Sequence, residues 1–308
     1  MHRGIIFFAR TSLIFCAATF SLSAAFGRGV DSIAKIEKLG GHLVKGHHVI
    51  DARRLLEPAC RRPDSTCLMH CLLAKAYMDD PDLDPKVVKR VDSELQTAIK
   101  LNPSSGYAYR VWAEWDNLQG NYKAAIVHSK KALAVKDSEN DAWRQLTIAY
   151  SNLGDYKAAL ECTERRFKLD GATEAHFLTK AALLEKLNRR GEAAQQYREA
   201  LKVRNVDTTV NLLVDCLTTD GKYQDAIVEI SQLIKKNPND SEAIAKRAAL
   251  QSKLKHYKEA IQDYTAALDL DPSPRLYTAR AAVYGLNNQK KQADDDIAKA
   301  KKLSASNF

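Results

Sequence analysis

The chain has 308 residues, a formal net charge of +9 and a mean hydropathy of −0.38, which excludes a polytopic membrane protein. Its length suggests two globular domains at roughly 150 residues each, and 45% hydrophobic residues with 28% charged ones exclude a disordered chain. Six cysteines exclude a disulfide scaffold, and 13 glycines with 8 prolines are too few for a turn-rich β protein, so we expect helices.

The first segment, residues 1–25, has the composition of a secretory signal peptide. Two arginines precede an uncharged, mostly apolar run from Thr11 to Phe26, and Ser23 and Ala25 supply small side chains before the cleavage point. We therefore predict an exported protein, periplasmic or secreted. An uncleaved membrane anchor and a mitochondrial transit peptide are two other interpretations, and contact with a membrane is expected only if the segment is not cleaved.

The next segment, residues 33–105, contains two imperfect helical hairpins. The first, Ile33–Arg62, carries Gly46 as its only recognisable turn residue before an apolar second half. The second begins with a helical pattern at Cys71–Met78 and continues, after a short insertion, with a helical pattern at Asp82–Pro103.

The remaining chain repeats one phrase, which includes GNYKAAI at Gly120–Ile126, GDYKAAL at Gly154–Leu160 and GKYQDAI at Gly221–Ile227. The alanine five places after the glycine recurs six times, with spacings of 34, 34, 33, 34 and 33 residues, at Ala125, Ala159, Ala193, Ala226, Ala260 and Ala293. Before each phrase runs an apolar pattern with helical spacing. Each unit therefore predicts two helices, with the glycine ending the first and the alanine allowing close approach of the second.

These units resemble the tetratricopeptide repeat, a 34-residue helix–turn–helix unit. The resemblance implies an all-α fold, a right-handed α-solenoid of about eight repeats. Two degenerate repeats occupy residues 33–105, and six regular ones occupy residues 106–307, at 106–139, 140–173, 174–206, 207–240, 241–273 and 274–307.

The resemblance also implies a concave groove lined by the first helix of each unit. In this register, the expected peptide- or protein-binding residues are Tyr107, Arg110, Glu114, Asn117, Arg144, Asn152, Asn211 and Asp215. Arginine and amide groups suit an extended peptide with acidic groups. We expect Arg110 and Arg144, one repeat apart at the same place, to form an acidic-ligand site. The Lys/Asn pairs that clamp chaperone tails in the family are absent from the corresponding places, which excludes that adaptor role.

The cysteines form a separate cluster in the sequence CRRPDSTCLMHC. In an oxidising compartment Cys60 could form a disulfide with Cys67 or Cys71; idle thiols are the alternative. A metal site at Cys67, His70 and Cys71, with His47 or His48, matches no strong ligand signature, so we expect no metal. A redox- or metal-linked accessory protein that uses Cys60, Cys67, Cys71 and His70 is the alternative function. Cys162 and Cys216 fall inside helices and are expected in the core.

Motifs for catalysis are missing from the sequence, which has no nucleophile elbow, phosphate-binding loop or zinc-protease helix. We interpret the acidic run Asp294–Asp296 as a polar face on the last repeat, because three consecutive helical residues cannot converge on one ion. The positive charge is too diffuse to indicate nucleic acid. We therefore expect a non-catalytic scaffold that binds a protein or peptide, with no cofactor and no small-molecule substrate.

Overall fold

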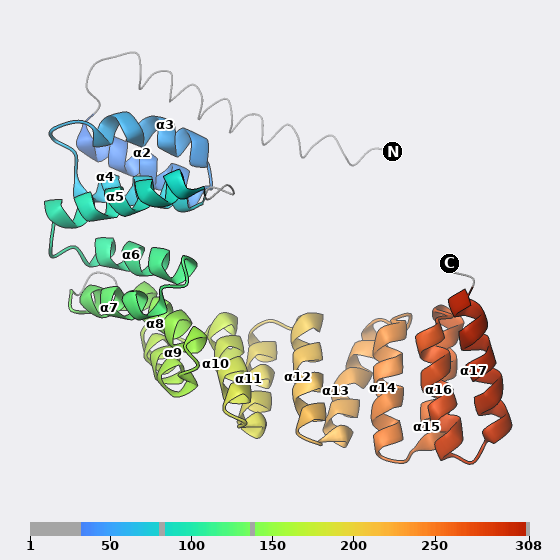
Figure 1. Cartoon of the computed structure of the whole chain (residues 1–308). Helices are drawn as coiled ribbons and strands as arrows, with labels where there is room; N and C mark the ends of the chain where they lie inside the picture. The colour runs from blue at the N-terminus through green and yellow to red at the C-terminus, as the bar shows by residue number, and fades with distance from the viewer. Residues whose placement is uncertain (1–31, 80–83, 136–138, 306–308) are drawn as a thin grey trace. The chain divides into compact units, whose positions relative to one another are not determined.

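The computed structural model describes residues 32–79, 84–135 and 139–305, and every regular element in these ranges is a helix (Figure 1). The predicted all-α class is therefore confirmed. The predicted signal peptide, residues 1–25, lies outside the described residues. The helices, in chain order, are α2 (Ile33–Lys45), α3 (Val49–Cys60), α4 (Cys67–Met78), α5 (Pro85–Leu101), α6 (Gly106–Leu118), α7 (Tyr122–Leu133), α8 (Glu139–Asn152), α9 (Tyr156–Asp170), α10 (Glu174–Lys186), α11 (Arg190–Val203), α12 (Asp207–Thr219), α13 (Tyr223–Lys236), α14 (Ser241–Lys253), α15 (Tyr257–Leu270), α16 (Pro274–Leu286) and α17 (Lys290–Ala305).

The chain divides into two compact units between Leu153 and Gly154. In the first unit α3 packs on α4, α4 on α5, α6 on α7 and α7 on α8, while α6 also contacts both α4 and α8. In the second unit each helix from α9 to α17 packs on the next one along the chain. Within the described ranges, no helix combines the length and apolarity that crossing a bilayer requires. Each unit is thus built from neighbouring helices joined by short turns.

In the hairpins whose turns the structure describes in full, the turn has a left-handed residue at the same place. From the third hairpin onward, this residue is Gly120, Gly154, Asn188, Gly221, Lys255 and Asn288, with φ between +57° and +80°. Glycine takes this conformation without strain, and asparagine tolerates it better than other side chains do. In the first hairpin the left-handed residue is His47 (φ +56°), whereas Gly46 has φ −85°. Three residues separate α2 from α3, and the second of them, His47, is the left-handed one. The left-handed residue therefore comes one place after Gly46.

The recurring alanines lie where two helices approach each other. Ala125, Ala159, Ala193, Ala226 and Ala260 are fully buried, and Ala293 is 8% exposed. A larger side chain at these places would separate the two helices of the hairpin. Cys162 and Cys216 are buried too, which confirms their predicted core positions.

One position on the first helix of a hairpin contacts one position on its second helix. The residues at these two positions form an aromatic pair in one hairpin and an ion pair in two others. In α6–α7 the pair is Trp112 stacked on His128 at 4.7 Å between ring centroids. In α14–α15 it is Arg247 with Asp263, a two-pronged ion pair with N–O distances of 2.7 and 2.8 Å. Thirty-three residues later, Arg280 binds the Asp296 carboxylate in the same way. Either pairing fixes one hairpin by a specific contact between its helices.

The Asp296 pairing corrects the interpretation of the acidic run Asp294–Asp296. Asp294 and Asp295 are exposed, but Asp296 is 2% exposed and faces α16, where Arg280 neutralises it. One of the three carboxylates is therefore an internal ion-pair partner, because successive residues on a helix point in different directions.

Candidate functional site

The eight residues expected to line a groove lie on three first helices, in both units. Four are on α6, two are on α8 and two are on α12: Tyr107, Arg110, Glu114, Asn117; Arg144, Asn152; Asn211, Asp215. Since α12 belongs to the second unit, the two sets are described separately.

A charged network joins α4, α6 and α8 in the first unit. Lys75 on α4 donates to both carboxylate oxygens of Glu114 on α6, at 3.1 and 2.9 Å. Arg110, also on α6, lies 3.5 Å from Glu114 and 3.4 Å from Asp141 on α8. Its guanidinium also stacks over the Tyr107 ring, 4.7 Å from the centroid. The charges alternate from helix to helix, so each first helix is held to the next by polar contacts.

This network changes the role expected of Arg110. The residue is only 7% exposed, and two carboxylates already satisfy it. An incoming acidic group would have to displace Glu114 or Asp141, so Arg110 acts as a link between helices instead of an open anion site. Tyr107 is half-buried beside it, and burial raises the pKa of its phenol to about 12.

Arg144 is different, because its side chain is 44% exposed and lies 3.6 Å from Asp141. Asp141 is 53% exposed and lies between the two arginines. An approaching partner can therefore reach Arg144 and Asp141 directly, while the buried Arg110 contacts Asp141. At exposures of this size an ion pair contributes about 0–1 kcal/mol, so it opens readily for a ligand.

The two asparagines of the first unit also have different settings. Asn117 on α6 is half-buried, and its amide donates to the backbone carbonyl and the side-chain oxygen of Gln145 on α8, at 3.0 and 2.9 Å. Asn152 is exposed and donates to the Ile148 carbonyl of its own helix at 2.9 Å. Asn117 thus adds a second α6–α8 link, while Asn152 is accessible.

In the second unit, Asn211 and Asp215 lie one turn apart on α12. Asn211 donates to the Asp207 carbonyl at 3.2 Å. Asp215 is 60% exposed and accepts the Lys246 ammonium of α14 at 2.8 Å. This contact joins neighbouring first helices by opposite charges, as the network of the first unit does.

Cys60, which could form a disulfide with Cys67 or Cys71, is a free thiol in the structure, and so are the other two cysteines. Cys67 and Cys71 are one turn apart on α4, and Cys60 is the last residue of α3. A hydrogen bond from Cys71 lowers the pKa of Cys67 to about 6, against the effect of its partial burial. Burial, reinforced by Glu94, raises the pKa of Cys60 to about 12. The hydrogen bond to Cys67 and burial also raise the pKa of Cys71, so the cluster contains one acidic thiol, Cys67, and two with raised pKa values.

Several site residues escape sequence reasoning. Lys75 and Gln145 are the cross-helix partners of Glu114 and Asn117, and the repeat register does not mark them.

The second unit also has a cavity of about 200 Å³ between α9, α10 and α11, lined in part by Phe167, Phe177 and Lys180. The signal that could have found it is the aromatic pair, whose rings meet edge to face at 5.6 Å.

Comparison with known proteins places the sequence likeness in the helical hairpins. A sequence model described as "Tetratricopeptide repeat" matches residues 241–274, which include α14 and α15. DnaJ homolog subfamily C member 3 of Rattus norvegicus is 28% identical over 166 residues, 48% of this chain and 33% of the relative. Hsp70-Hsp90 organizing protein of Triticum aestivum is 27% identical over 202 residues, 53% of this chain and 35% of the relative. The chain thus spans about a third of the length of these two relatives.

Solved structures give a weaker comparison. "YrrB: a TPR protein with an unusual peptide-binding site" is 19% identical, with 59% of this chain and 94% of that one covered, and a TM-score of 0.49. MamA from Desulfovibrio magneticus RS-1 is 16% identical, with 55% and 97% covered and a TM-score of 0.47. The likeness to tetratricopeptide repeats rests on the sequence match to the hairpin at residues 241–274.

Proposed function

We propose that the chain is a non-catalytic scaffold that binds a protein or an extended peptide along the first helices of its hairpins. The observation that carries the proposal is the row of cross-helix polar contacts on α4, α6 and α8, which ends in the exposed pair Asp141 and Arg144. Similarity to tetratricopeptide-repeat proteins supports the same reading, because stacked hairpins of this kind present an extended surface.

The internal pairing of this surface favours recognition over catalysis. Lys75 and Arg110 are paired with Glu114 and Asp141, two positive charges with two negative ones, so the charges of the network are matched internally. Such fixed charges and amides hold their positions before a ligand arrives, which reduces the entropy lost on binding. A partner segment that presents an acidic group to Arg144 and a basic or amide group to Asp141 fits this arrangement.

Affinity capture with matched charge-reversal variants tests the proposal. Arg144→Glu alters the exposed end of the network on α8, and Lys130→Glu makes the same charge change at an exposed position on the second helix α7. We expect partners captured from an extract of the source organism to be lost with Arg144→Glu and retained with Lys130→Glu. Equal capture by both variants would show that the partner does not bind the first helices of this unit.

Export, to a periplasm or by secretion, is part of this proposal and rests on the composition of residues 1–25 alone. Amino-terminal sequencing of the protein from its source tests it. A mature chain that begins near Phe26 supports export, and one that begins at Met1 contradicts cleavage.

A further inference from the structure

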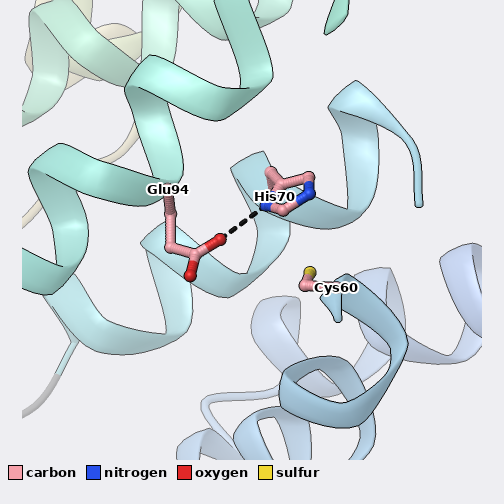
Figure 2. A group of neighbouring side chains, drawn as sticks. All are labelled: Cys60, His70 and Glu94. Carbon is pink, nitrogen blue, oxygen red and sulfur yellow. Dashed lines mark hydrogen bonds and ion pairs between the residues drawn. The ribbon is translucent and has the colours of Figure 1, made fainter. Parts of the chain in front are cut away.

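Three side chains with metal-ligating atoms meet in the first unit, and they come from three different helices (Figure 2). Cys60 is the last residue of α3, His70 lies on α4 and Glu94 lies on α5. One ligand atom of each lies within 4.8 Å of the other two. His70 and Glu94 are each 5% exposed, and Cys60 is partly buried. The cluster is therefore inside the helical packing and not on an acidic surface.

The outer contacts of this cluster orient its ligand atoms. His70 Nδ1 faces Glu94 Oε2 at 2.5 Å, while Nε2 lies 3.2 Å from the Ser65 hydroxyl. Arg90 lies 3.0 Å from Oε1, the other oxygen of Glu94. A metal-bound histidine commonly engages its second ring nitrogen in a hydrogen bond that fixes the ring, and Ser65 is placed to provide it. Arg90 contacts one carboxylate oxygen of Glu94. Figure 2 shows the other oxygen directed at His70.

The spacing suits a small tetrahedral ion. Metal–ligand distances of about 2.0–2.3 Å place neighbouring ligand atoms of a tetrahedral zinc site about 3.3–3.6 Å apart. The His70–Glu94 separation is shorter than this, and all three separations stay within 4.8 Å. Side-chain rotations that move these atoms by about 1 Å would give tetrahedral spacing, without relocating a helix.

We propose that Cys60 Sγ, His70 Nδ1 and Glu94 Oε2 bind one zinc ion that ties α3 to α4 and α5. Sulfur, nitrogen and oxygen ligands together favour zinc over calcium or magnesium, which prefer oxygen alone. In the bound state the Cys60 thiol proton has left to solvent, Glu94 is a carboxylate, and His70 is a neutral ring with Nδ1 towards the ion and its single proton on Nε2, which donates to the Ser65 hydroxyl. Water completes the fourth position. The ligand set revises the sequence expectation of no metal and differs from Cys67, His70 and Cys71.

The site has a structural purpose that is independent of the proposed scaffold function. The first two hairpins lack the regular glycine–tyrosine–alanine phrase, and α3 ends at Cys60 with a proline, Pro58, inside its last turn. A bound ion would fix this helix end to the neighbouring hairpin. Structural zinc contributes directly to folding stability in this way.

Cobalt(II) titration of the full chain tests the proposal, because a thiolate–cobalt bond gives a charge-transfer band and tetrahedral geometry gives intense visible bands. We expect one equivalent of Co²⁺ to bind and Zn²⁺ to displace it. Cys60→Ala should abolish the charge-transfer band. Cys67→Ala, a cysteine control at the start of α4, should retain it. Absence of the band in the native chain, or its survival in Cys60→Ala, would overturn the proposal.

A second measurement uses the native chain alone and so does not depend on the folding of a variant. Cysteine alkylation, read by peptide mass spectrometry, should be slower at Cys60 with one equivalent of Zn²⁺ than with chelator, because the zinc-bound sulfur is not free to attack the reagent. Cys216 of the second unit serves as the internal control and should react at the same rate in both samples. An unchanged rate at Cys60 would contradict zinc binding at this site.

Discussion

The ion pair between Arg280 and Asp296 should dominate the stability of the last hairpin. Both carboxylate oxygens of Asp296 accept from the guanidinium, at 2.7 and 2.9 Å, and the two side chains are 12% and 3% exposed. Asp296→Asn keeps the shape of the side chain and removes its charge. It leaves Arg280 buried without a counter-charge, and breaking a buried pair in this way costs about 3–5 kcal/mol.

We expect Asp296→Asn to lower the free energy of unfolding of α16–α17 by about 3 kcal/mol, the lower end of that range, because Thr265 still accepts from Arg280 at 2.9 Å. The equivalent change in the preceding hairpin, Asp263→Asn, should cost about 2 kcal/mol, since Arg247 and Asp263 are 25% and 13% exposed. Replacing the buried pair together, as Arg280→Met with Asp296→Leu, should restore most of the loss.

Urea unfolding followed by circular dichroism measures these differences, and hydrogen exchange assigns them to a hairpin, because repeat proteins can lose a terminal unit separately. A loss below about 1 kcal/mol for Asp296→Asn would place the pair with exposed surface ion pairs and refute the reasoning from burial.

Three further predictions concern single residues. Lys255→Gly should raise the free energy of unfolding by about 1 kcal/mol in a urea titration, because Lys255 has φ +64° at a turn where other hairpins have glycine. Burial and Arg166 lower the pKa of His176, so the unfolded chain binds its proton first and stability falls as pH drops through about 6.5 towards the lower folded pKa. His176→Gln should flatten this dependence in pH-dependent melting curves, and the exposed His256→Gln should not. Iodoacetamide should modify Cys67 with a half-maximal rate near pH 6, and Cys71→Ala should shift that midpoint upward; a midpoint near 9 in the native chain would contradict the lowered pKa of Cys67.

The repeated phrase predicts the helical class and the buried alanines because both depend on spacing along the chain. A residue that recurs every 33 or 34 places occupies one position in one hairpin, so Ala125 and its equivalents share one packing environment. The turn position also follows where the glycine belongs to the repeated phrase, at Gly120, Gly154 and Gly221. It fails at Gly46, where the left-handed residue is His47, because a single glycine without the rest of the phrase does not fix the register.

Spacing says much less about which side chains pair. Arg110 and Arg144 hold the same place in adjacent units, yet one is buried between carboxylates and the other is exposed. The difference arises from their neighbours. Glu114 contacts Arg110 on the same helix, and Lys75, from the irregular second hairpin, contacts Glu114. Glu94 is likewise 24 residues from His70 and carries no motif, so only the packing of α4 on α5 brings them together.

Site-specific photo-crosslinking tests the central claim, that a partner binds along the first helices. A photoreactive amino acid replaces Arg144 on α8, Asn211 on α12 or, as the second-helix control, Lys130 on α7, and the native extract is irradiated. The account predicts crosslinks from each first-helix position and none from Lys130. Crosslinks from Lys130 alone would contradict it and place the binding surface on the second helices.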